Sequence, residues 1–327
     1  MGVGTDGALL LISSTAYPLR VVVTLPDMVR SLTVDLDGPT HYFDYGGPDG
    51  APVIVAVHGL GGAGWNWAAV APALTRHYRL LAIDLAGHGR TPAGRRKTTV
   101  GANRRLLDRF VREVVGEPVV LMGNSMGGAI SLLEAAKSPD VVRALVLVDP
   151  ALPRPMLAPI DPLVAASFAL MSLPGLGETV MRRRRRRRTA AEQVRETLAL
   201  CCVDPSRIPP DVVRLGVALA EERYGDEFAA RDFLAAARSL VRMLAASGRF
   251  REAMQRVQAP VLMLHGDNDR LVSLHVAEQV AAANPSWRFE VARGIGHVPQ
   301  LEAPEWTASL VLDWLTSLQS TASSSAR

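Results

Sequence analysis

The chain has 327 residues, of which 48% are hydrophobic and 21% charged, and its formal net charge is +4. This length allows one large domain or a core domain with an inserted lobe, and the composition excludes global disorder. The run Arg182–Arg188 supplies more than the whole net charge, so the basicity is local and we do not expect the chain to bind nucleic acid.

The N-terminal extension, residues 1–31, contains an early acidic residue and no basic segment, which argues against a secretory signal. No apolar stretch reaches the ~18–20 uncharged residues that a membrane span needs. The two cysteines, Cys201 and Cys202, are neighbours, so they form neither a disulfide framework nor a zinc site. We therefore expect a cytoplasmic protein that uses no metal and no cofactor.

The next segments, SLTVDL and THYFDYG, alternate apolar and polar residues and predict a hairpin that turns at Asp37-Gly38. Continuous apolar runs, typical of strands buried on both faces, follow at 52–59, 78–89, 117–125, 142–150 and 259–267, with a last strand at 287–292. Helical patterns lie at 100–115, 126–137, 274–283 and from 304 to about 318. This alternation predicts an α/β fold, a mostly parallel sheet with helices on both faces and one antiparallel edge.

Between Pro150 and about Gln258 the alternation gives way to an Ala-, Leu- and Arg-rich stretch with helical periodicity. We predict a helical cap at 151–258, inserted between core segments 32–150 and 259–319, and a flexible tail at 320–327. The apolar part of the cap, 161–181, is expected to pack on the core and to line a lipophilic pocket. The run Arg182–Arg188 predicts a solvated helical face, and a weak contact with an anionic membrane surface is the alternative.

The sequence Gly123-Asn124-Ser125-Met126-Gly127 fits the pattern G-x-S-x-G and lies between an apolar strand and a helix, as that motif requires. A tight bend there would strain the backbone of the serine and lift its hydroxyl clear of the sheet, and glycine neighbours would avoid clashes. The following helix N-terminus adds partial positive charge. We interpret Ser125 as a nucleophile; a plain glycine turn before a helix is the alternative.

A nucleophilic serine needs a base within hydrogen-bond reach, and the base needs an orienting acid. His297 lies on a glycine-flanked loop between the last strand and the last helix. Asp267 and Asp269 follow a strand and give the order Ser…Asp…His. Asp149, which follows the preceding strand, is a further candidate for the acid.

These motifs resemble those of the α/β-hydrolase superfamily with a helical cap, over about residues 32–318. The superfamily's HGxGG segment matches residues 58–62, and its DxxGxGxS segment matches 84–91, with Thr91 in place of serine. Its GxxD motif runs from Gly266 to Asp269, which implies that Asp269 is the acid, and its final GH matches Gly296-His297. The resemblance implies an eight-stranded sheet.

The resemblance also implies an oxyanion hole formed by the backbone N–H groups of Leu60 and Met126. His58 and His88 are expected to be structural. A serine nucleophile with such a hole transfers an acyl group to water through an acyl-enzyme, so we expect a serine hydrolase that cleaves carboxylic esters of lipophilic small molecules.

Two alternatives stay open. GNSMGG also resembles carbon–carbon bond hydrolases acting on dienoate ring-cleavage products, although these commonly carry an aromatic residue after the histidine, where this chain has Val298. A hydrolase-like scaffold that only binds a partner is the other alternative, because a fold does not establish a function. Serine in place of aspartate at position 125 argues against epoxide hydrolases and haloalkane dehalogenases.

Overall fold

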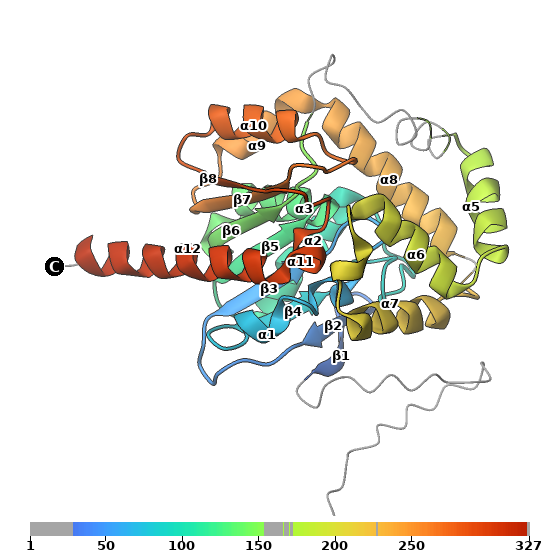
Figure 1. Cartoon of the computed structure of the whole chain (residues 1–327), viewed down its shortest axis with the longest axis horizontal. Helices are drawn as coiled ribbons and strands as arrows, with labels where there is room; N and C mark the ends of the chain where they lie inside the picture. Colours follow the sequence, from blue (N-terminus) through green and yellow to red (C-terminus); the bar gives the residue numbers. More distant parts are fainter. Residues whose placement is uncertain (1–28, 154–165, 167–169, 171–172, 227, 326–327) are drawn as a thin grey trace, which may run out of the picture.

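A computed structural model describes residues 29–153, 166, 170, 173–226 and 228–325 (Figure 1). The predicted N-terminal extension lies almost wholly outside the described residues, and so does much of the apolar segment 161–181. Among the described residues, no helix combines the length and the apolar character needed to cross a bilayer.

Eight strands form one sheet in the order β1-β2-β4-β3-β5-β6-β7-β8. Their bounds are β1 Arg30–Asp35, β2 Pro39–Asp44, β3 Val53–Val57, β4 Arg79–Ile83, β5 Val119–Asn124, β6 Val142–Val148, β7 Val261–Gly266 and β8 Arg288–Ala292. Strand β2 pairs antiparallel with β1 and β4, and the remaining neighbours are parallel. The predicted sheet, with its antiparallel edge, is confirmed. The hairpin turns at Asp37 and Gly38, which have φ of 59° and 125°.

Helices cover both faces of the sheet (Figure 1). One face packs against α2 (Val100–Arg109), the π-helical turn η2 (Phe110–Val115), α3 (Met126–Lys137), α9 (Ser247–Gln255) and α10 (Leu274–Ala283). The other face packs against α1 (Ala71–Leu74) and α12 (Pro304–Ser325). Alternate residues of each central strand point to the two apolar cores, so both faces of the strands are buried, as their continuous apolar sequences predict.

The inserted lobe contains α5 (Leu176–Arg186), α6 (Ala190–Cys201), η4 (Pro205–Arg207), α7 (Pro210–Glu222) and α8 (Ala229–Ala245). Residues of α6 and α7 form a small apolar cluster with Val298 and Leu301 of the core, which fixes the lobe above the carboxyl ends of the strands. Helix α9 falls inside the predicted cap, yet its residues Phe250, Ala253 and Met254 belong to the sheet's own apolar core.

The C-terminal segment 320–327, expected to be a flexible tail, is helical as far as Ser325. No proline or glycine follows Pro304, so no residue in this segment forces the helix to end. In Figure 1, α12 extends beyond the body of the molecule toward the C-terminus. Residues 326–327 lie outside the described part of the chain.

Candidate active site

Ser125 occupies a sharp bend between β5 and α3, with φ of 53° and ψ of −119°, a conformation that L-residues rarely adopt. A side chain at Gly127 would collide with the carbonyl oxygen of Val57, and one at Gly123 would collide with the backbone of the helix. Ser125 is held by a hydrogen bond from its N–H to the Val148 carbonyl, at 3.1 Å. The strained bend expected from the motif is therefore present.

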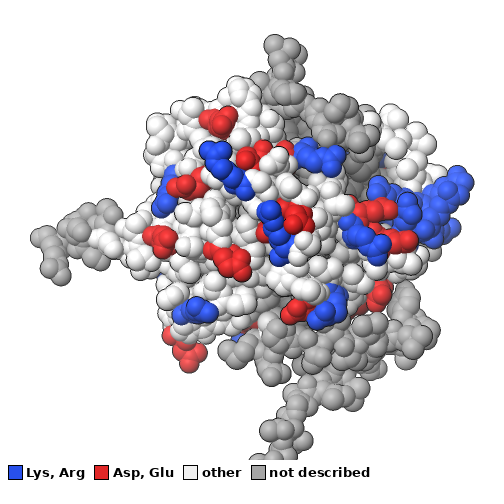
Figure 2. All heavy atoms as spheres, viewed as in Figure 1, with Lys and Arg blue, Asp and Glu red and all other residues white. Residues whose placement is uncertain are grey.

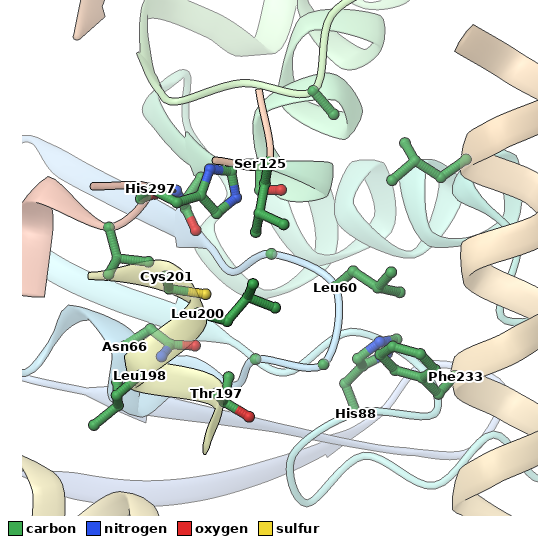
Figure 3. A pocket seen from close by; sticks show the side chains of 18 of the residues that line it. Leu60, Asn66, His88, Ser125, Thr197, Leu198, Leu200, Cys201, Phe233 and His297 are labelled. Atoms are coloured by element: carbon green, nitrogen blue, oxygen red, sulfur yellow. Dashed lines mark hydrogen bonds between the residues drawn. The ribbon is translucent and has the colours of Figure 1, made fainter. Parts of the chain in front are cut away.

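His297 lies next to Ser125 in Figure 3 and donates from Nδ1 to Oδ2 of Asp269, at 2.7 Å. The other carboxylate oxygen of Asp269 accepts the N–H groups of Leu271 and Val272, at 2.7 and 3.0 Å. Burial alone would raise the pKa of Asp269, but His297 holds it below its ordinary value. A carboxylate in this position fixes the imidazole so that Nε2 is free to accept a proton.

The two other candidate acids make different contacts. Asp267 accepts the N–H of Gly294 at 2.7 Å and so ties its own loop to the histidine loop. Asp149 is fully buried and accepts the N–H of Gly266 at 3.0 Å. Ligand atoms of Asp149, Asp269 and His297 all lie within 4.8 Å of one another, but Nδ1 of His297 and Oδ2 of Asp269 are bonded to each other, so this cluster does not fit a metal site.

Three residues that the sequence did not single out position the histidine loop. Asn124 donates from Nδ2 to the carbonyl oxygens of Val148 and His297, at 3.0 and 3.1 Å. The N–H of His297 donates to the carbonyl of Cys201 in the cap, at 2.6 Å. Buried Glu302 accepts the N–H of Gly296 with Oε2 and that of Val203 with Oε1, at 2.8 and 2.9 Å. Of these three residues, only Asn124 is marked by a sequence pattern, because it occupies the first variable position of G-x-S-x-G.

The loop after His58 approaches Ser125 from the neighbouring strand, and Leu60 lies on it in Figure 3. Gly61 has φ of 75°, which suits glycine at this point. The backbone N–H groups of Leu60 and Met126 donate to no other described residue, so both are free to bind an oxygen of a substrate.

His58 and His88 hold the loops, as expected. His58 donates from Nδ1 to the Gly59 carbonyl at 2.7 Å and accepts the Leu85 N–H with Nε2 at 3.0 Å. Burial lowers the pKa of His58 and takes that of His88 to about 3, so both rings are neutral. Thr91, which stands where the family has serine, accepts the N–H of His41 at 2.8 Å and so still supports its loop.

A cavity of about 1600 Å³ lies between the core and the cap and is lined by Ser125, His297 and Asp269. Most of its wall is apolar and includes Leu60, Leu152, Val180, Met181, Leu198, Leu200, Leu219, Phe233, Leu240, Leu244, Val298 and Leu301. Four cations, Arg184, Arg185, Arg223 and Arg270, also reach its wall. A cavity of this size and character accommodates a lipophilic small molecule.

The arginine run forms the end of α5 and the turn after it, and basic atoms gather at the edge of the molecule where α5 lies (Figure 2). Arg184 and Arg188 pair with Glu196 of α6, at 2.7 and 2.9 Å. Arg185 donates to the carbonyl of Arg223 at the end of α7, at 2.8 Å. The side chains of the remaining members, Arg182, Arg183, Arg186 and Arg187, make no hydrogen bond or ion pair with the described residues.

Comparisons with known proteins agree with this fold. The monoacylglycerol lipase abhd6-B of Xenopus laevis is 26% identical over 285 residues, covering 86% of this chain and 80% of that protein. The 2-hydroxy-6-oxo-6-(2'-aminophenyl)hexa-2,4-dienoic acid hydrolase of Metapseudomonas resinovorans is 27% identical over 284 residues, covering 85% and 87%. In fold, the haloalkane dehalogenase DatA of Agrobacterium tumefaciens C58 is similar, with a TM-score of 0.75, 24% identity and coverage of 89% and 97%. The model of the alpha/beta hydrolase fold family matches residues 52–304, and the chain belongs to this family of enzymes.

Proposed function

We propose that this enzyme is a serine hydrolase that cleaves carboxylic esters of lipophilic small molecules through an acyl-enzyme. The observation that carries the proposal is the strained Ser125, exposed to the cavity beside a histidine that is itself bonded to Asp269. A turn with no catalytic role would be less strained with glycine than with a serine at φ of 53°, so the strained serine favours a functional role. The same constellation argues against a scaffold that only binds a partner.

The reaction follows from these positions. Ser125 Oγ attacks the carbonyl carbon of the ester while Nε2 of His297 takes its proton. The free N–H groups of Leu60 and Met126 stabilise the oxyanion of the tetrahedral intermediate. When the intermediate collapses, His297 gives the proton to the departing alcohol oxygen. Water, activated in turn by His297, then releases the acid and restores Ser125.

A fluorophosphonate probe tests the nucleophile, because it reacts covalently with an activated serine. We expect labelling of the parent enzyme and none of Ser125→Ala. The matched control is Ser273→Ala, because Ser273 also lines the cavity but has no histidine partner among the described residues. Labelling that persists in Ser125→Ala would remove Ser125 from this role.

Carbon–carbon bond hydrolysis is the second candidate, and two observations favour it: the similarity to the Metapseudomonas enzyme and the four arginines of the cavity wall, among them Arg270. A dienoate substrate carries a carboxylate that an arginine could bind. However, Arg184 already pairs with Glu196 and Arg223 with Asp226, at 2.7 and 2.8 Å. Val298 packs into the apolar cluster between cap and core rather than offering an aromatic surface.

Ester and carbon–carbon cleavage are separated by measuring both on one preparation, with Ser125→Ala as the blank. A series of p-nitrophenyl esters of increasing acyl length covers the first reaction, and a dienoate ring-cleavage product covers the second. We expect turnover of the esters and little of the dienoate. Efficient dienoate cleavage with negligible ester turnover would replace the proposed reaction by the second candidate.

A further inference from the structure

A second carboxyl group, that of Asp149, is buried against the proposed triad and has no part in the mechanism above. Asp149 follows β6, is 0% exposed and has φ of 43°, in the left-handed region. Its backbone N–H donates to the carbonyl of Leu264, and its Oδ1 accepts the N–H of Gly266, at 2.9 and 3.0 Å. Strong backbone contacts therefore hold this carboxyl group within 4.8 Å of ligand atoms of Asp269 and His297.

Two carboxylates cannot both stay ionised at such a distance inside a protein without a large cost, so the pair holds one proton. The hydrogen-bond donors decide which group carries it. Asp269 accepts three N–H groups, from His297, Leu271 and Val272, whereas Asp149 accepts one. Donors stabilise a carboxylate in its charged form, so the charge belongs on Asp269 and the proton on Asp149.

The remaining oxygen of Asp149, Oδ2, is buried and accepts no hydrogen bond from the described residues. An unbonded buried carboxylate oxygen is costly, but the same oxygen carrying a proton can donate to Asp269. Burial and the charge of Asp269 also raise the pKa of Asp149 well above its ordinary value. We propose that Asp149 is a neutral acid that donates its proton to a hydrogen bond with Asp269 and thereby positions the triad carboxylate.

The other ionisable groups around Asp149 fit this assignment. His265 on β7 has Nδ1 3.5 Å from Oδ1 of Asp149, and its Nε2 donates to the Val272 carbonyl at 3.0 Å. Burial lowers the pKa of His265, so the ring is neutral and adds no charge to the pair. Burial raises the pKa of Cys201, on α6 above the pair, to about 12, and its thiol is neutral. Glu302 adds to the raised pKa of Asp149, and its two carboxyl oxygens accept backbone N–H groups of Gly296 and Val203.

The inference rests on the proposed triad, and the pH dependence of ester hydrolysis tests it. Asp149→Asn keeps the shape, the neutral charge and an N–H donor, and asparagine tolerates the left-handed conformation. Glycine in Asp149→Gly also tolerates the left-handed conformation, but this variant removes the hydrogen-bond donor to Asp269. Without the donor, Asp269 attracts the proton of His297 more strongly. The rise of kcat/KM on the acid side of its pH profile (the acid limb), which reports the deprotonation of His297, should therefore move to higher pH.

We expect Asp149→Gly to lose about tenfold or more in kcat/KM, the scale of one hydrogen bond to a charged group, and to show this upward shift. Asp149→Asn should recover most of the loss and leave the acid limb where the parent has it. If Asp149 were ionised, both variants would remove a negative charge beside His297, and the limb would move to lower pH in both. That downward shift, or parental kinetics in Asp149→Gly, would overturn the proposal.

Infrared spectroscopy of the resting enzyme gives a second test that needs no turnover, so it separates this inference from the proposed function. A neutral carboxylic acid has a C=O stretch at higher frequency than a carboxylate. Glu134 is the other carboxyl group of the described residues whose pKa burial raises, to about 7. At about pH 8 the band should therefore belong to Asp149. It should vanish in Asp149→Asn and persist in the control Glu134→Gln. A parent spectrum without the band would refute the neutral acid even if the esterase assays succeed.

Discussion

Nδ1 of His297 lies 2.7 Å from Oδ2 of Asp269, and this hydrogen bond joins the loop after β7 to the loop after β8. The bond is buried, with exposed side-chain fractions of 5% for His297 and 0% for Asp269. Charge that develops on the imidazole is therefore stabilised in a site with little water to screen it.

The first prediction concerns Asp269→Asn. An amide can donate to Nδ1 and favour the tautomer in which Nε2 carries a proton, so the histidine can no longer act as a base. We expect kcat to fall about 10³–10⁴-fold while the fold is unchanged. Asp267→Asn is the matched control, because Asp267 bonds Gly294 instead of the imidazole, and its loss should stay below about tenfold. Equal losses in the two variants would contradict the assignment of the acid.

Much of this site could be predicted because its parts are local. The glycines around Ser125, the GxxD segment and the loop of His297 each mark the carboxyl end of a strand, and parallel strands bring those ends to one edge of the sheet. The elements with strong periodicity also match closely: α3 and α10 have the bounds that the sequence pattern gives.

The contacts that assemble the site could not be predicted. Glu302 joins the histidine loop to the cap over about a hundred residues of sequence, and no pattern marks such a pair. Helix α9 has the periodicity of the cap helices but packs with the core, because periodicity gives a helix its apolar face and not its partner. The switch from α2 to a π-helical turn at Phe110 is likewise set by tertiary packing.

The second prediction is a pH dependence of stability that comes from Glu134 of α3. Its side chain is 0% exposed and its pKa is about 7, raised chiefly by burial despite an ion pair with Arg104 at 2.7 Å. Glutamate has an ordinary pKa of 4.5, which applies to the unfolded chain. Between that value and about 7, the folded state therefore binds more protons than the unfolded state. Stability should fall as pH rises from about 4.5 to about 7, by an amount on the order of 3 kcal/mol.

Thermal unfolding across this pH range measures the effect. Glu134→Gln should flatten the dependence of Tm on pH, because the amide does not ionise. Glu113→Gln is the control, since Glu113 is exposed and, within the described part of the chain, pairs with Arg109 alone. This variant should leave the slope close to that of the parent. An unchanged slope in Glu134→Gln would mean that other groups cause it.

The third prediction addresses the arginine run. Arg182, Arg183, Arg186 and Arg187 are exposed, and α5 also exposes Leu176 and Val180. A weak contact with an anionic lipid surface would gain about 1 kcal/mol from each basic residue and would be screened by salt. Co-sedimentation with anionic vesicles at low ionic strength, and none with neutral vesicles, would distinguish this contact from the solvated face that the sequence predicts. Replacing the four by glutamine should abolish it. No binding of the parent at low salt would leave the run as a solvated face.

The last prediction tests the loop that carries Leu60. Gly61 has φ of 75°, and a Cβ atom there would lie 3.0 Å from Cε2 of Phe233, a residue of cap helix α8. Gly61→Ala therefore introduces backbone strain of about 1 kcal/mol and pushes the loop against the cap. If the Leu60 N–H stabilises the oxyanion, displacing it should lower kcat by about 10²–10³-fold and change KM little, because that contact forms only in the transition state.

Two further variants separate the causes. Phe233→Leu in the Gly61→Ala background removes the clash but not the strain, so it should restore kcat only in part. Gly94→Ala introduces the same kind of strain at φ of 58°, where nothing lies within 4 Å of the new Cβ atom, so it should lower stability and leave kcat as in the parent. A parental kcat in Gly61→Ala would exclude this loop from the oxyanion hole, because displacing the Leu60 N–H would then have no effect on the reaction.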